Sequence, residues 1–193
     1  MSMETIKKLR EQTGAGVNDC HQALSANNND YDLALEWLRK KGQKIANKKS
    51  DRALKAGLID SYIHGEGKVG VLLKLGCETD FVAKNEDFKN FSHDLCLQIA
   101  ATDPQYVGPE DVPAEVVAKE KEIYAETLKA ENKPAEMLEK ILAGKVEKFY
   151  TEVCLLKQPY IKDDKVTIEQ LLTEVIAKIG ENIKIDSFTR YSL

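Results

Sequence analysis

The sequence lacks any apolar run long enough to span a membrane, which would need about 18 consecutive apolar residues. The first ten residues carry four charged side chains and no apolar stretch, so they do not resemble a secretion signal. The four cysteines are widely separated, which indicates no disulfide framework; they are Cys20, Cys77, Cys96 and Cys154. We therefore expect a cytoplasmic protein with reduced thiols and no membrane partner.

Motifs for catalysis and metal binding are also missing. Residues 65–70 satisfy G-x-G-x-x-G, but a dinucleotide site needs a helix after this motif, and here strands are expected on both sides. His93 and Cys96 are three residues apart, yet two ligands do not make a zinc site. No candidate nucleophile has a recognisable base beside it. We therefore expect a protein that is not an enzyme and that holds no metal or cofactor.

The charge is slightly negative overall and unevenly distributed. The chain has 28 basic and 32 acidic residues, a formal net charge of -4, which argues weakly against bulk nucleic-acid binding. One stretch, residues 39–55, is strongly basic and contains Arg39, Lys40, Lys41, Lys44, Lys48, Lys49, Arg52 and Lys55. We interpret residues 43–56 as a solvated, partly helical linker. The alternative is electrostatic contact with RNA, although specific base stacking is not expected without aromatic residues.

Residues 1–42 predict a three-helix module. Gly14 and Gly16 separate the first two helices, because glycine tolerates the backbone angles of a tight turn. A polar turn at 27–30 precedes a third helix whose apolar residues recur at helical spacing, namely Tyr31, Ala34, Leu35 and Leu38. Gly42 is expected to end this helix.

Residues 57–193 predict an α+β core. Strands are expected over 58–64 and 69–75, joined by a hairpin turn at 65–67. Helices follow, including a helical hairpin over 113–157 whose turn is expected at Glu131-Asn132-Lys133, before Pro134. A capping box at 167–170 starts a further helix that Gly180 ends, and Ile183 and Ile185 then alternate as in a strand. The result is a small antiparallel sheet packed with helices.

The segment between the second strand and the next helix is expected to be a loop with two adjacent apolar residues, Phe81 and Val82. A loop aromatic can anchor a partner. It can equally pack into its own core, as most aromatics do. Composition and spacing leave both interpretations open.

Four stretches resemble the elongation factor Ts family, in the same order along essentially the whole chain. They are Cys77-Glu78-Thr79-Asp80-Phe81-Val82-Ala83-Lys84-Asn85 and the motifs within residues 9–24, 37–42 and 149–159. The resemblance implies a nucleotide exchange factor for the GTPase elongation factor Tu, with a ubiquitin-associated-like N-terminal module.

The resemblance also implies which residues contact the partner. The N-terminal module would use Leu9, Arg10, Val17 and Asn18, the last two standing where the family often has methionines. The core would place Thr79, Asp80, Phe81 and Val82 near the magnesium site of the GTPase. The chain is similar to short family members with a single core half, so a homodimer is expected.

Overall fold

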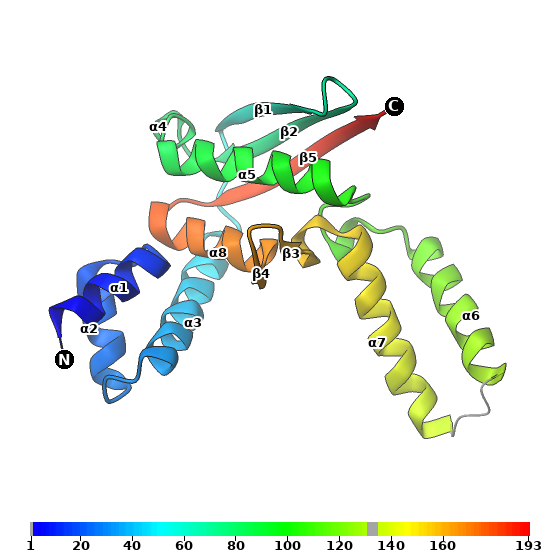
Figure 1. The fold of residues 1–193 in the computed structure, drawn as a ribbon, viewed down its shortest axis with the longest axis horizontal. Coiled ribbons are helices and arrows are strands. Elements are labelled where there is room, and N and C mark those ends of the chain that lie inside the picture. The colour runs from blue at the N-terminus through cyan, green and yellow to red at the C-terminus, as the bar shows by residue number, and fades with distance from the viewer. Residues whose placement is uncertain (1, 131–134) are drawn as a thin grey trace. The chain divides into compact units, whose positions relative to one another are not determined.

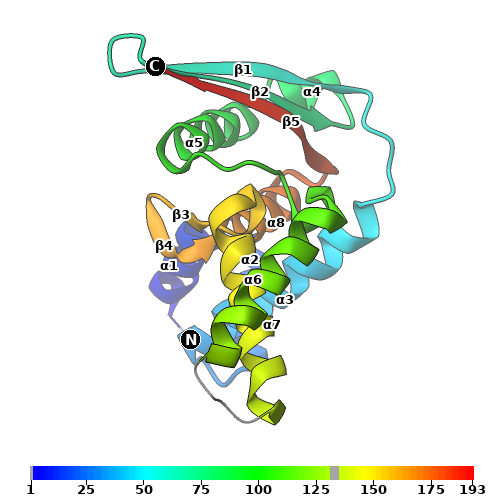
Figure 2. The same ribbon diagram turned by 90° about the vertical axis from the view of Figure 1, so that its right-hand side faces the viewer.

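The computed structural model describes residues 2–130 and 135–193 and shows an α+β fold, as predicted (Figures 1 and 2). The chain forms two compact units. One consists of the chain up to Leu97 together with Gln170–Leu193, and the other of Gln98–Glu169. In the described parts of the chain, no helix is both long and apolar enough to cross a membrane.

The first unit begins with three helices, α1 (Met3–Thr13), α2 (Val17–Ala26) and α3 (Tyr31–Lys49). Ser2 and Asp30 cap α1 and α3 by accepting backbone N–H groups. Their apolar faces share one core, made of Ile6, Leu9, Cys20, Ala23, Leu24, Ala34 and Leu38. The three predicted helices are thus confirmed.

The prediction that Gly42 ends the third helix was wrong, because α3 continues through it to Lys49. Gly42 is buried where α3 meets α8 (Ile168–Ile179). A Cβ added to Gly42 would lie 3.5 Å from the Cβ of Ala177. This is an ordinary van der Waals distance, so α3 and α8 are in contact here and residues 43–49 are a docked helix. The boundaries 1–42, 43–56 and 57–193 stay a prediction.

The sheet of the first unit has the strand order β1-β2-β5 and is antiparallel throughout. It consists of β1 (Ala56–His64), β2 (Val69–Cys77) and β5 (Ile183–Ser192). The alternation in β2 is confirmed, because Val71, Leu73 and Leu75 are buried. Helix α5 (Glu86–Thr102) lies along one face of this sheet (Figure 2).

Two turns of the first unit also match the sequence analysis. The β1–β2 turn has positive φ at Gly65, Glu66 and Gly67, and the Lys68 N–H donates to the His64 carbonyl at 3.1 Å. The G-x-G-x-x-G stretch is therefore a hairpin turn. Helix α8 ends before Gly180, whose φ of +84° is a conformation that favours glycine.

The second unit contains the helical hairpin of α6 (Ala114–Ala130) and α7 (Ala135–Val153), which lie side by side (Figure 1). The predicted turn at Glu131-Asn132-Lys133 and Pro134 lies outside the described residues. Two 3-10 turns, Pro109–Asp111 and Leu155–Lys157, precede and follow these helices. A two-stranded sheet, β3 (Pro159–Tyr160) with β4 (Asp163–Thr167), was not predicted.

A buried amide pair stabilises the base of this hairpin. Gln98 and Gln158 are almost fully buried, and the Gln98 Nε2 donates to the Gln158 Oε1 at 3.2 Å. The Gln158 Oε1 also accepts the Thr102 hydroxyl at 2.6 Å, and its Nε2 donates to the Glu152 carbonyl at 3.2 Å. Gln158 thus connects α5, α7 and the start of β3.

Candidate functional site

The segment after β2 is a single helical turn, α4 (Asp80–Ala83), where we had expected a loop. Thr79 starts this turn, because its hydroxyl oxygen accepts the backbone N–H of Val82 at 3.4 Å. Asn85 caps the next helix, since its Oδ1 accepts the N–H of Asp87 at 2.7 Å. Thr79 thus caps the start of α4, and Asn85 caps the start of α5.

This turn exposes two neighbouring side chains and buries a third. Phe81 is 88% exposed and Asp80 is also exposed, whereas Val82 is only 9% exposed. The alternative that Phe81 packs into the core was therefore wrong. Val82 anchors the turn from below, and the surface available to a partner is formed by Asp80 and Phe81.

Residues far away in the sequence support the turn. The carboxylate of Glu181 accepts two hydrogen bonds from Thr79, one from its backbone N–H at 3.0 Å and one from its hydroxyl at 2.7 Å. The backbone N–H of Asn182 donates to Glu78 Oε1 at 2.6 Å. Sequence reasoning missed both residues, and the only signal was that they follow the helix-ending Gly180.

Charge strengthens this support. The hydrogen bond from the Asn182 N–H holds the pKa of Glu78 below its usual value. The guanidinium of Arg52, which lies 3.5 Å away, contributes to a smaller extent. The side-chain amide of Asn182 donates to the carbonyls of Ser50 and Arg52 at 3.2 and 2.9 Å. The end of α3, the start of α4 and the chain before β5 are therefore joined by one hydrogen-bond network.

The N-terminal module presents three of its four candidate residues. Arg10, Val17 and Asn18 are exposed, with Val17 46% exposed at the start of α2. Leu9 is fully buried in the core of the module, so we leave it out of the proposed contact set. Gly14 ends α1 with a φ of +65°, which sets the direction of the turn into α2.

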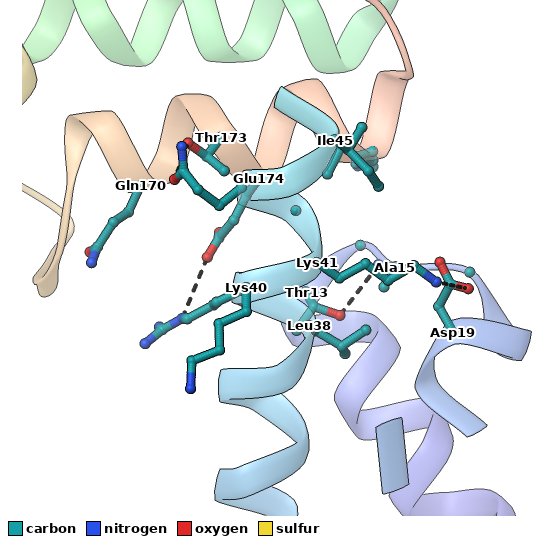
Figure 3. A pocket seen from close by; sticks show the side chains of 17 residues that line it. Thr13, Ala15, Asp19, Leu38, Lys40, Lys41, Ile45, Gln170, Thr173 and Glu174 are labelled. Atoms are coloured by element: carbon teal, nitrogen blue, oxygen red, sulfur yellow. Dashed lines mark hydrogen bonds and ion pairs between the residues drawn. The ribbon is translucent and has the colours of Figure 1, made fainter. Parts of the chain in front are cut away.

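A cavity of about 310 Å³ lies within the first unit, between the turn at residues 13–16, the middle of α3 and α8 (Figure 3). Two cations on its rim are already paired. Arg39 contacts Glu174 at 3.8 Å and Lys41 contacts Asp19 at 2.8 Å. Because these charges neutralise each other, we assign no ionic ligand to this cavity.

The basic stretch 39–55 is largely engaged within the protein. Five of its eight cations contact acids or carbonyl oxygens: Arg39, Lys40, Lys41, Lys49 and Arg52. These contacts do not favour the alternative of RNA binding. They are what is expected of a helix docked on its own protein.

The pair His93 and Cys96 does not present two ligands to one site. His93 is exposed, whereas Cys96 is fully buried, and burial raises the pKa of its thiol to about 12. Among the described residues, no group of three or more His, Cys, Asp or Glu side chains is arranged to hold a metal ion.

Comparisons with known proteins point in one direction. The family described as Elongation factor TS matches residues 2–193. The elongation factor Ts of Carboxydothermus hydrogenoformans is 51% identical over 193 residues, covering 100% of this chain and 89% of that protein. That of Moorella thermoacetica is 52% identical over 188 residues, covering 97% and 93%. That of Thermotoga neapolitana is 51% identical over 193 residues, covering 100% and 97%, so it is of nearly the same length.

Proposed function

The chain belongs to the elongation factor Ts family, and from this premise we propose that it is a guanine-nucleotide exchange factor for elongation factor Tu. In this role it binds the GTPase, disturbs its magnesium and phosphate site and promotes release of GDP during translation elongation. It works by binding and carries out no chemistry of its own.

The exposed side chain of Phe81 is the observation that carries this proposal. A single exposed apolar residue is common on protein surfaces and means little alone. Here a large aromatic is 88% exposed on a turn that Thr79 caps at its start and that is hydrogen-bonded to a distant segment. A rigid, exposed aromatic is the kind of residue that dominates binding energy at interfaces.

The thermodynamics of nucleotide exchange are consistent with insertion of an aromatic side chain, which we call a wedge, into the GTPase. In GTPases the bound Mg²⁺ bridges the phosphates and neutralises their charge. A factor that binds the nucleotide-free state more tightly must weaken nucleotide binding by the same factor, because the two affinities are linked. We propose that Phe81 displaces the elements around the ion, with the exposed carboxylate of Asp80 beside it.

A matched pair of variants tests the role of Phe81. Phe81→Ala should slow stimulated release of a fluorescent GDP by about tenfold, corresponding to ~1.4 kcal/mol, measured by stopped flow over a range of factor concentrations. Its stability should change by less than ~0.5 kcal/mol, because the side chain is exposed. Ile123→Ala, which truncates an exposed apolar residue in the second unit, is the control and should be as fast as wild type. Release of GDP by Phe81→Ala at the wild-type rate would refute the role assigned to Phe81.

We also propose that the protein forms a homodimer through the face of the sheet opposite α5. Four exposed apolar residues lie on this face by strand register: Ile59, Ile63, Leu72 and Tyr191. Burying such a surface against a second copy would remove apolar area from water. Light scattering should give a dimeric mass at micromolar concentration, and Leu72→Glu should give a monomer. A monomeric mass for the wild-type protein would contradict this proposal.

A further inference from the structure

The Phe81 turn is held by a residue from outside its own segment. We propose that Glu181 is a positioning residue, which fixes the turn so that Phe81 points toward the partner. This inference rests on the proposed function, because it concerns how the binding turn is oriented.

Both hydrogen bonds of Glu181 go to Thr79, the residue that precedes the exposed pair. Its carboxylate accepts the backbone N–H and the hydroxyl of Thr79, at 3.0 and 2.7 Å. The same hydroxyl oxygen accepts the N–H of Val82 at 3.4 Å. Thr79 and Val82 flank Asp80 and Phe81. The carboxylate therefore restrains the backbone directly at Thr79 and, through the Thr79 hydroxyl, at Val82.

The turn needs an external restraint. A helix of four residues is far shorter than the dozen or so that an isolated helix needs to be even marginally stable. The buried side chain of Val82 fixes the turn from below, but a single apolar anchor leaves rotation about it open. The bonds to Glu181 oppose that rotation, because they hold a second point of the turn, Thr79.

Glu181 is itself fixed by its two neighbours. The carbonyl of Gly180 accepts a hydrogen bond from the Lys49 ammonium at the end of α3. Asn182 is bonded through its backbone to Glu78 and through its side chain to the carbonyls of Ser50 and Arg52. A carboxylate on such a fixed backbone loses little further freedom when it binds Thr79, so it can hold the turn in one orientation.

Loss of this restraint should lower the fraction of molecules whose turn is ready to bind. Apparent affinity falls in proportion to that fraction, although no contact with the partner has been removed. We expect Glu181→Ala to lower the second-order rate constant of stimulated GDP release by about fivefold. Glu181→Gln should lie between this variant and wild type, because its amide oxygen can still accept one of the two bonds.

The control removes a charge of the same sign close by. Glu86 lies on the surface of α5, five residues from Phe81, and pairs with Lys89 at 2.9 Å. Glu86→Gln should release GDP at the wild-type rate. An equal loss in Glu86→Gln would mean that the net charge near the turn matters and would overturn the positioning role.

A double-mutant cycle separates positioning from a general loss of stability. In the Phe81→Ala background, Glu181→Ala should have no further effect, because there is no wedge left to position. A structural defect would lower the rate by the same factor in both backgrounds, and that result would overturn the inference. Thr79→Val removes the hydroxyl donor but keeps the backbone N–H that bonds Glu181, so it should lie between wild type and Glu181→Ala. Should Glu181→Ala fail to fold, Glu181→Gln and Thr79→Val carry the same test.

The outcomes also distinguish this inference from the proposed function. Normal GDP release by Phe81→Ala would overturn both the proposed role of Phe81 and the positioning role of Glu181, because α4 would then not be the binding turn. Slow release by Phe81→Ala together with normal release by Glu181→Ala would overturn the positioning role alone.

Discussion

Replacing Gly42 by alanine should stabilise the protein, because this glycine lies inside a helix and has room for a methyl group. An added Cβ would lie 3.5 Å from the Cβ of Ala177 and 3.8 Å from the Cγ2 of Thr173, which are ordinary van der Waals distances. Glycine in a helix interior is about 1 kcal/mol less favourable than alanine. Since no clash offsets this gain, we expect the free energy of unfolding to rise by about 1 kcal/mol.

Replacing Gly180 by alanine is the control, and it should lower the free energy of unfolding. Gly180 has a φ of +84°, and no atom of the described residues lies within 4 Å of an added Cβ. Alanine there would meet no clash but would have to adopt a left-handed conformation, which costs roughly 1–2 kcal/mol. Gly180→Ala should therefore destabilise the protein through the backbone alone.

Urea unfolding followed by circular dichroism measures both effects, and thermal unfolding provides a check. A gain of ~1 kcal/mol should raise Tm by roughly 2–4 °C in a domain of this size. A loss of stability in Gly42→Ala would refute the reasoning, because it would mean that α3 cannot accept even a methyl group against α8. Gly42→Leu should be destabilising by ~1–3 kcal/mol, since it overfills the contact.

Three further predictions concern other parts of the chain. Gln158→Ala should cost ~1–3 kcal/mol in urea unfolding, because the buried amide nitrogen of Gln98 loses one of its two acceptors; a neutral result would contradict the role of this pair. The folded-state pKa of Glu78 is lowered, so its stabilisation is present above its unfolded pKa of about 4.3 and is lost as pH falls through the folded value. Glu78→Gln should therefore weaken the acid dependence of stability. Burial raises the pKa values of Cys96 and Cys154 to about 12 and about 11, so a thiol reagent at neutral pH should label them much more slowly in native than in unfolded protein.

Sequence patterns correctly predicted the structural elements that are determined by neighbouring residues. The alternation in β2 and the glycine-rich turn before it depend on neighbouring residues, and both are confirmed. Gly42 and Gly180 show the limit of such reasoning. Both follow a helical pattern, but Gly180 ends its helix, whereas Gly42 lies inside a continuing helix that contacts another more than a hundred residues away in the chain. A sequence does not reveal which of these two roles a glycine has.

The geometry of the candidate site also depends on contacts that the local sequence does not show. The segment around Phe81 stood out in the sequence, yet its exposure depends on which side of the turn faces the core. That orientation is set by Thr79 capping the turn and by Val82 packing beneath it. Glu181 was missed because it reaches the turn only after the chain reverses at Gly180.

In the proposed exchange role, the rigidity of this turn matters because Phe81 has to keep its orientation while it contacts the GTPase. A flexible Phe81 would have to lose conformational freedom on binding, and this loss would subtract from the energy available to deform the GTPase. The structure avoids much of that loss by burying Val82 and by bonding Thr79 to Glu181 before any partner is present. Under the proposed function, more of the binding energy of Phe81 would then remain for distinguishing the nucleotide-free GTPase from the loaded one, which is the difference that exchange requires. It follows that substitutions beneath the turn should slow exchange as well as those on its surface, although the residues beneath it do not contact the partner.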